Sequence, residues 1–298
     1  MNKTKLDFYK ESGIAAPLNT ALVIFCSLIT ILFFSYFYSL IINYLPIIYF
    51  NIILVIVYGF IISYVSRLFN IIFKIRNRMK SIIITIILSI FAVYFQWVSY
   101  LYIISSENFS LFMVFEDLGF FFKILFRPDL VLNNILDINK VGLWSIGTSG
   151  IHLNGLFLWL IWLAEAAIII YVSVKKYTTF NLIPFSEKNN KWFKKEVIDF
   201  DFEHISFKKD FVESFASNPF ETISELKRGN GLRHSKITMY TSETESKNLI
   251  TIDNIIVTQR GKGKKDITNV LKLCYVDSLF SSQIRTKFQT KKESIFDY

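Results

Sequence analysis

The sequence predicts a membrane-embedded bundle of four helices followed by a cytosolic α+β domain with a small antiparallel meander. Two observations support this fold class. Four long apolar stretches precede Lys176, and each is long enough to cross a bilayer, which takes about 20 residues. After Lys176 the composition becomes polar and charged, with apolar residues alternating as in strands. We therefore predict a membrane domain at 1–176 and a cytosolic domain at 177–298.

The first two apolar stretches, 18–42 and 47–66, form a helical hairpin. Neither stretch contains a charged residue, and the short connection Asn43–Pro46 makes them antiparallel neighbours. A third span is expected at 81–104, after the segment 67–80, which holds five basic residues and no acidic one. The polar N-terminus lacks the features of a cleaved signal peptide, so we expect the first span to be retained.

The fourth span, at about 155–174, contains Glu165 near its middle. A carboxylate at that depth costs about 3 kcal/mol by insertion scales, so Glu165 is the first candidate for a functional residue. Candidate partners at similar depth are Tyr58 on the second span and Gln96 on the third. Three roles stay open: binding a proton or cation, forming a structural hydrogen bond within or between protomers, and lining a water-filled pore.

Small residues on the second span favour close packing of the helices. Gly59 and Ser63 are four residues apart, so they share one helix face and permit a neighbouring helix to approach. The spans contain no second acidic residue and no basic residue near their middle. A single carboxyl is weak support for a transporter, and a structural hydrogen bond is the slightly favoured interpretation.

Basic residues near the span ends predict the orientation. They gather in the N-terminal segment, in 67–80 and at Lys175–Lys176, whereas the opposite side has only three, all in its long second loop. The positive-inside rule then places both termini in the cytoplasm. The chain is rich in Ile, Asn, Lys and Phe, a usage that resembles AT-rich bacterial proteomes. Together with the four spans, this usage leads us to expect a multi-pass protein of a bacterial inner (plasma) membrane.

The outer segment 105–154 is too long for a simple turn. Scattered charges and Pro128 exclude a continuous span, so its apolar first half is expected to lie in the membrane interface or over the mouth of the bundle. Asp129 is predicted to be the N-cap of a second short helix that reaches about Asn139. Glycines from 142 onward indicate turns.

The cytosolic domain is expected to contain helices and a meander. Two short helices are predicted within 207–228, separated at Asn218–Pro219. Three alternating stretches predict antiparallel strands at 235–241, 249–259 and 270–276, with polar hairpin connections. A short helix and a charged tail follow.

A cluster of basic residues on this domain is a candidate site for an anion or a lipid headgroup. Glycines in the RGKGKK stretch allow close backbone approach, and lysines supply charge, although the spacing differs from that of a phosphate-binding P-loop. A solvated hairpin tip is the alternative and favoured interpretation. The candidate residues are Arg260, Lys262, Lys264, Lys265, Arg233 and Lys236.

Catalytic and cofactor motifs are not evident in the sequence. The three histidines are far apart along the chain, and Cys26 and Cys274 are too few for a disulfide framework or a zinc site. We therefore expect no enzymatic activity, cofactor or metal. The formal charge of +9 fits an anionic membrane surface better than nucleic acid, because the apolar spans already require a bilayer.

These features favour a membrane-anchored interaction or assembly subunit of a bacterial inner-membrane complex. Its cytosolic domain would dock a partner protein, and its bundle would contact lipid and form a homo-oligomer. The alternative is an ion channel or transport subunit with Glu165 in the path, gated by an anionic ligand on the basic cytosolic face. That alternative requires polar residues facing one another on several spans, and we expect few of them.

Overall fold

The structure is a computed structural model that divides into two compact units. It describes residues 6–45, 48–106, 117–142, 144–146, 151–242, 245–258 and 264–293. The unit within Gly13–Phe180 is called the membrane unit below. The unit that combines residues before Gly13 with residues from Asn181 onward is called the sheet unit.

The membrane unit contains four helices long and apolar enough to cross a bilayer, which confirms the predicted multi-pass bundle. They are α1 (Pro17–Tyr44), α2 (Ile48–Ile72), α3 (Arg78–Ser105) and α6 (Gly155–Thr179). Within the bundle α1 packs mainly on α3, and α2 packs mainly on α6. Helix α2 extends beyond the predicted end at Ser66. Arg67, the charged residue at that predicted end, is buried, and its guanidinium carbon lies 4.1 Å from the ring centroid of Phe180.

Helices α2 and α6 meet at Gly59. A Cβ atom added there would lie 2.9 Å from Cβ of Val172 and 3.2 Å from the carbonyl oxygen of Ile169. Any larger residue would force the two helices apart. The predicted close approach of a neighbouring helix at Gly59 is therefore confirmed.

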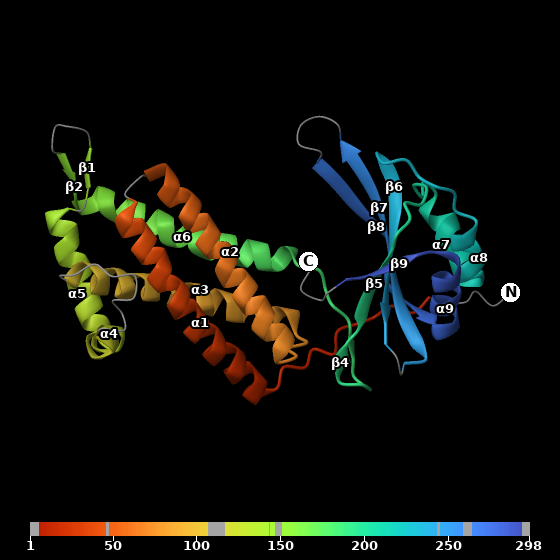
Figure 1. Cartoon of the computed structure of the whole chain (residues 1–298), viewed down its shortest axis with the longest axis horizontal. Helices are drawn as coiled ribbons and strands as arrows, with labels where there is room; N and C mark the ends of the chain where they lie inside the picture. The colour runs from red at the N-terminus through yellow and green to blue at the C-terminus, as the bar shows by residue number, and fades with distance from the viewer. Residues whose placement is uncertain are drawn as a thin grey trace. The chain divides into compact units, whose positions relative to one another are not determined.

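Two short helices and a small hairpin lie at one end of the bundle (Figure 1). They are α4 (Leu118–Leu125), α5 (Pro128–Val141), β1 (Trp144–Ile146) and β2 (Ile151–Leu153). Asp117 is the N-cap of α4, and its carboxylate accepts a hydrogen bond from the Phe120 amide at 2.8 Å. Phe121 and Ile124 of α4 pack in a cluster with residues of α1 and α3.

Two sequence predictions for this end differ from the structure. Helix α5 begins at Pro128 with Arg127 as N-cap, so Asp129 lies in the first turn and not at the cap. Proline suits the first helical position because its missing N–H would be unpaired there anyway. The residues expected to be turns after 142 include strand β1, which pairs antiparallel with β2.

The sheet unit is built on a five-stranded antiparallel sheet in the order β8-β7-β6-β5-β9. The three predicted strands are present and longer than expected: β6 (Arg233–Thr241), β7 (Lys247–Thr258) and β8 (Lys264–Asp277). Four further strands were not predicted: β5 (Lys194–Ile198), β9 (Thr290–Glu293), and β3 (Phe185–Ser186), which forms a small hairpin with β4 (Lys191–Trp192). These strands are short and mostly polar, so backbone pairing and not an apolar pattern defines them.

Three helices cover one face of this sheet (Figure 1). They are α7 (Lys208–Ser217), α8 (Pro219–Ser224) and α9 (Ser278–Lys287), and the break at Asn218–Pro219 is as predicted. Their buried residues pack on the inner face of the sheet: Phe215, Ile223, Phe280 and Ile284 against Ile237, Met239, Ile250 and Ile252.

The N-terminal segment, which the sequence analysis placed with the membrane domain, is part of the sheet unit. It runs antiparallel to the edge strand β8, with a bridge between Phe8 and Cys274. The Tyr9 amide donates to the Leu273 carbonyl at 2.9 Å, and the Tyr275 amide donates to the Asp7 carbonyl at 2.9 Å. A polar lead sequence gives no signal for this pairing, because its hydrogen bonds use backbone groups alone.

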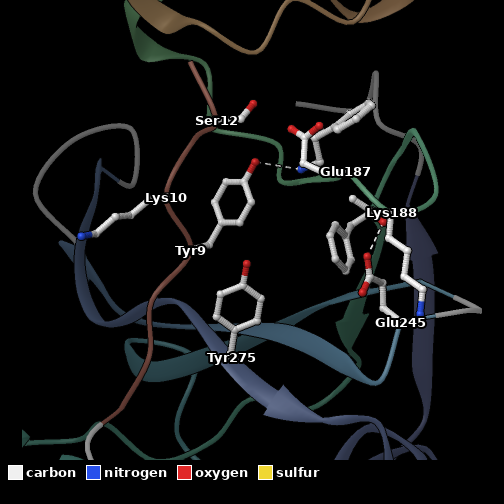
Figure 2. A pocket seen from close by; sticks show the side chains of 10 residues that line it. Tyr9, Lys10, Ser12, Glu187, Lys188, Glu245 and Tyr275 are labelled. Atoms are coloured by element: carbon white, nitrogen blue, oxygen red, sulfur yellow. Dashed lines mark hydrogen bonds between the residues drawn. The ribbon is translucent and has the colours of Figure 1, made fainter. Parts of the chain in front are cut away.

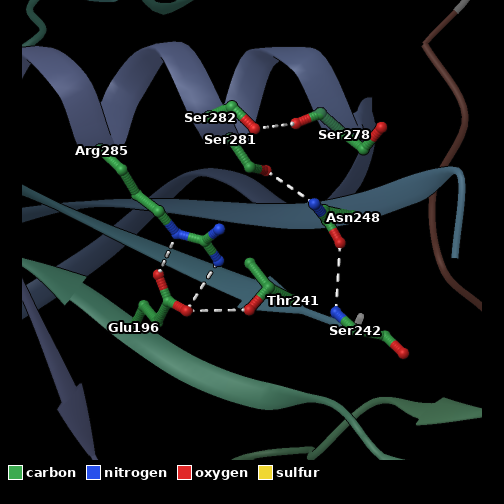
Figure 3. Close-up of polar contacts among 8 residues, drawn as sticks. All are labelled: Glu196, Thr241, Ser242, Asn248, Ser278, Ser281, Ser282 and Arg285. Carbon is green, nitrogen blue, oxygen red and sulfur yellow. Dashed lines mark hydrogen bonds and ion pairs between the residues drawn. The ribbon is translucent and has the colours of Figure 1, made fainter. Parts of the chain in front are cut away.

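An ion pair ties α9 to the central strands (Figure 3). The carboxylate of Glu196, only 2% exposed, accepts two hydrogen bonds from the Arg285 guanidinium, each 2.8 Å, and one from the Thr241 hydroxyl at 3.0 Å. Burial by itself raises the pKa of Glu196. The hydrogen bonds from Arg285 and Thr241 and the Arg285 charge outweigh burial and lower the pKa below its ordinary value.

Candidate functional site in the membrane unit

Glu165 on α6 contacts two other helices through one carboxylate oxygen. Its Oε1 accepts a hydrogen bond from the Tyr38 hydroxyl of α1 at 2.6 Å. The same oxygen accepts a second from Nε2 of Gln96 of α3 at 3.2 Å. The predicted pairing of Glu165 with Gln96 is thus present, and the group joins α1, α3 and α6.

Tyr58 of α2 contacts Tyr38 and does not form a hydrogen bond with Glu165. Its ring, 1% exposed, stacks on Tyr38 with ring centroids 4.5 Å apart. Its hydroxyl lies 2.5 Å from the Ser35 hydroxyl and donates to the Ala92 carbonyl at 3.3 Å. Tyr58 therefore positions Tyr38, the residue that contacts the carboxylate directly.

Tyr38 is the residue that sequence reasoning missed. Ser35, Tyr38 and Ser39 follow the i, i+3, i+4 spacing that puts side chains on one helix face. All three are buried, and the Ser39 hydroxyl donates to the backbone carbonyl of Gln96 at 2.8 Å. This spacing was a usable signal in the first apolar span, where polar residues would otherwise face lipid.

A polar stripe on α3 continues the pattern along the bundle. Its side chains recur at helical spacing and are buried: Ser81, Thr85, Ser89, Gln96 and Ser99. The hydroxyls of Ser66 and Thr85 lie 2.7 Å apart, linking α2 to α3. Those of Ser89 and Ser173 lie 2.6 Å apart, linking α3 to α6. The expectation that few polar residues face one another was wrong, because serine and threonine occur within the apolar stretches and their hydroxyls pair between helices.

The geometry of these contacts limits what the group can do. The hydrogen bonds around Glu165 are direct, so no water lies between the bonded atoms. Tyrosine hydroxyl and glutamine amide groups can each donate and accept, so they can pair with a carboxylate or with a carboxylic acid. The side-chain hydrogen bonds described above each join two or three helices of the bundle. The arrangement is suited to holding helices together.

Only some residues of the predicted basic site lie close to one another in the structure. Arg233 is exposed at the start of β6, and Lys265 is exposed near the start of β8, at the same end of the sheet. Lys236 forms an ion pair with Asp201 at 2.6 Å, so its charge is already balanced. Arg260 and Lys262 lie outside the described residues, as does the side chain of Lys264.

Metal ligands are not assembled in the described part of the chain, where no three His, Cys, Asp or Glu side chains form a suitable group. No protein-family model matches the sequence, and no curated protein or solved structure is significantly similar to it.

Proposed function

We propose that the protein is a membrane-anchored interaction or assembly subunit. Its membrane unit serves as a rigid anchor, and its sheet unit docks a partner protein. The observation that carries this proposal is the direct bonding of Glu165 to Tyr38 and Gln96. Glu165, an acidic residue that is costly to place in a bilayer, joins three helices through the two hydrogen bonds that its Oε1 atom accepts.

The pairing of the two chain ends supports a shared side of the membrane for both. Residues 7–9 are hydrogen-bonded to β8 within the sheet unit. Four spans return the chain to the side on which it started, in agreement with this pairing. The basic residues near the span ends favour the cytoplasm for that side and the inner membrane of a bacterium for the bilayer.

The exposed surface of α6 supports further contacts within the membrane. Leu156, Leu160 and Leu163 are each more than half exposed on this helix. Such an apolar surface suits lipid or a second copy of the chain. We therefore retain membrane lipid, a protein partner and a homo-oligomer as the proposed contacts.

The polar stripe of α3 favours one alternative, an ion channel or transport subunit with Glu165 in the path and an anionic ligand as its gate. Ion flux into liposomes, measured for wild type and for Glu165→Gln, separates the two functions. The anchor proposal predicts no flux from either protein and an unchanged mass of the detergent complex. Wild-type flux that disappears in Glu165→Gln, at unchanged mass, would contradict it.

The docking part of the proposal has its own test. Native membranes are cross-linked and solubilised, and the mass of the purified complex is compared with that of the chain alone. We expect a stoichiometric second protein that is retained in Glu165→Gln and lost when the sheet unit is deleted. A complex that contains only lipid and this chain would contradict the proposal that the sheet unit docks a partner protein.

Orientation is tested by labelling single cysteines in a chain whose Cys26 and Cys274 have been replaced. We expect an impermeant thiol reagent to label position 129 in intact cells, and positions 74 and 176 only after the membrane is opened. Labelling of position 74 in intact cells would contradict the proposed orientation.

A further inference from the structure

The sheet unit contains a cavity of about 320 Å³ (Figure 2). Its walls come from the N-terminal segment, from the β3–β4 hairpin and from the loop and strand at Glu245 and Tyr275. This volume is at the lower end of the range for small-molecule sites, about 300–1,000 Å³. The cavity therefore has room for a small group and not for a large cofactor.

Aromatic rings form much of the wall. Tyr9, Tyr275, Phe185 and Phe193 all line the cavity. The Phe185 amide donates to the Tyr9 hydroxyl at 3.1 Å and holds that ring in place. Figure 2 shows the Tyr275 hydroxyl directed toward Tyr9. The face of an aromatic ring carries negative potential and attracts cations, and Nζ of Lys247 lies 5.9 Å from the centroid of the Tyr275 ring.

The polar part of the wall contains two carboxylates and two lysines. Glu187 and Glu245 line the cavity, and the Ser186 hydroxyl donates a hydrogen bond to the Glu245 carboxylate. Burial raises the pKa of Tyr9, the hydrogen bond from the Phe185 amide lowers it, and the charges of Glu11 and Glu187 raise it. Burial also raises the pKa of Tyr275, and the charges of Asp7 and Glu245 add to the effect.

The lysines at the cavity differ in position. In Figure 2 the Lys10 side chain extends to the far side of the N-terminal segment from the Tyr9 ring. Lys188 extends alongside Glu245. A ligand cation at Glu245 would therefore lie on the same side of the cavity as Lys188.

We propose that this cavity binds an organic cation, a primary ammonium or guanidinium group, against Tyr9, Tyr275 and Glu245. The cation belongs either to a free amine or to a Lys or Arg side chain of a partner protein. Carboxylate hydrogen bonds to such groups are stronger than neutral ones, and aromatic faces add cation–π attraction. This inference does not depend on the anchor role of the membrane unit.

The test uses the full chain in detergent, because both ends of the chain contribute to the wall. Butylammonium and butylguanidinium are titrated by calorimetry, with 1-butanol as the neutral control. Blocked Gly-Lys-Gly and Gly-Arg-Gly peptides form the second arm. We expect at least one cation to bind and 1-butanol not to bind. Binding of the peptides alone assigns the site to a partner's side chain, and binding of the small cations alone assigns it to a free amine.

Variants test which residues hold the cation. Glu245→Gln keeps an acceptor for Ser186 but removes the charge, and we expect an affinity loss of at least about tenfold. Tyr275→Leu should reduce affinity about 2- to 30-fold through the lost cation–π contact. Lys188→Gln should increase affinity because it removes a like charge from the wall of the cavity. Glu225→Gln, an acid on the surface at the end of α8, is the matched control and should bind as wild type.

Three results would overturn the proposal. The first is that none of the four cationic probes binds. The second is that 1-butanol binds as well as butylammonium. The third is that Glu245→Gln and Glu225→Gln bind the probes with equal affinity.

Discussion

The membrane unit and the sheet unit each withdraw a carboxyl group from solvent, and they give it different partners. Glu165 is held by a tyrosine hydroxyl and a glutamine amide, both neutral. Glu196 is held by the guanidinium of Arg285, whose side chain is 43% exposed. In a bilayer a buried cation would add a second desolvation cost, whereas at a water-facing surface the cation keeps part of its hydration.

The largest expected effect comes from removing the cation of the sheet unit. Arg285→Ala leaves the charge of Glu196 buried with Thr241 as its remaining hydrogen-bond donor. Losing one partner of a buried pair costs about 3–5 kcal/mol, and we expect about 2–3 because Arg285 is partly exposed. Denaturant unfolding of the sheet unit, followed by tryptophan fluorescence, measures the loss.

Lys209→Ala, which removes an exposed cation from α7, is the control and should not change stability. Glu196→Gln should cost less than Arg285→Ala, because it leaves no buried charge. Equal losses from Arg285→Ala and Glu196→Gln would show that the buried charge is not what makes the pair important.

Tight packing of the membrane unit gives the next effect. In Gly59→Ala the added methyl would contact Val172 and the Ile169 carbonyl, so α2 and α6 must separate. Overpacking of this kind costs about 1–3 kcal/mol. Thermal unfolding in detergent measures it. Gly119→Ala is the matched control, because a Cβ there would meet only the Asp117 side chain at 3.4 Å. If both variants melt alike, α2 and α6 do not pack as closely as described.

Acid should affect the sheet unit through Glu196. Its pKa in the folded state is lower than the ordinary value of 4.5. The group therefore stabilises the fold fully above that ordinary value, and the stabilisation is lost as the pH falls through the folded pKa. Stability measured from pH 7 to pH 3 should fall at the acidic end in wild type and fall less in Glu196→Gln. Parallel curves would assign the acid sensitivity to other carboxylates.

Removing a neutral partner of Glu165 should lower the stability of the membrane unit by less than removing Arg285 lowers that of the sheet unit. Tyr38→Phe removes one interhelical hydrogen bond and keeps the ring stacked on Tyr58. Such bonds average about 0.6 kcal/mol in membranes and reach about 1.7. Glu165→Gln retains a donor and an acceptor and should lie within the same range. Steric-trapping measurements in bilayers would detect the difference, and a loss as large as that of Arg285→Ala would contradict the comparison.

The smallest effect is expected at the exposed pair of Arg127 and Asp129. The hydrogen bond from Arg127 lowers the pKa of Asp129 to about 2. Both groups are hydrated, so Arg127→Ala should leave thermal unfolding unchanged within error. A shift comparable to that of Gly59→Ala would mean that this pair is covered in the membrane-bound protein.

The sequence by itself determined the four apolar spans, the two short helices around Asn218–Pro219 and three strands of the sheet. These features depend on local composition and on the period of apolar residues, which any single segment displays. It also identified Glu165 and Gln96, because polar residues stand out in apolar stretches. Tyr38 was missed, although its spacing with Ser35 and Ser39 on one helix face was visible in the first span.

Only the tertiary structure decided how the N-terminal segment and the short strands β5 and β9 pair. The N-terminal segment pairs with β8, and β5 and β9 enter the sheet, through backbone hydrogen bonds that carry no side-chain signature. Tyr9 and Tyr275 are far apart in the sequence, and they line one cavity because of that pairing. Local patterns determine the elements, whereas partners distant in the chain are determined by long-range packing, which no single stretch of sequence records.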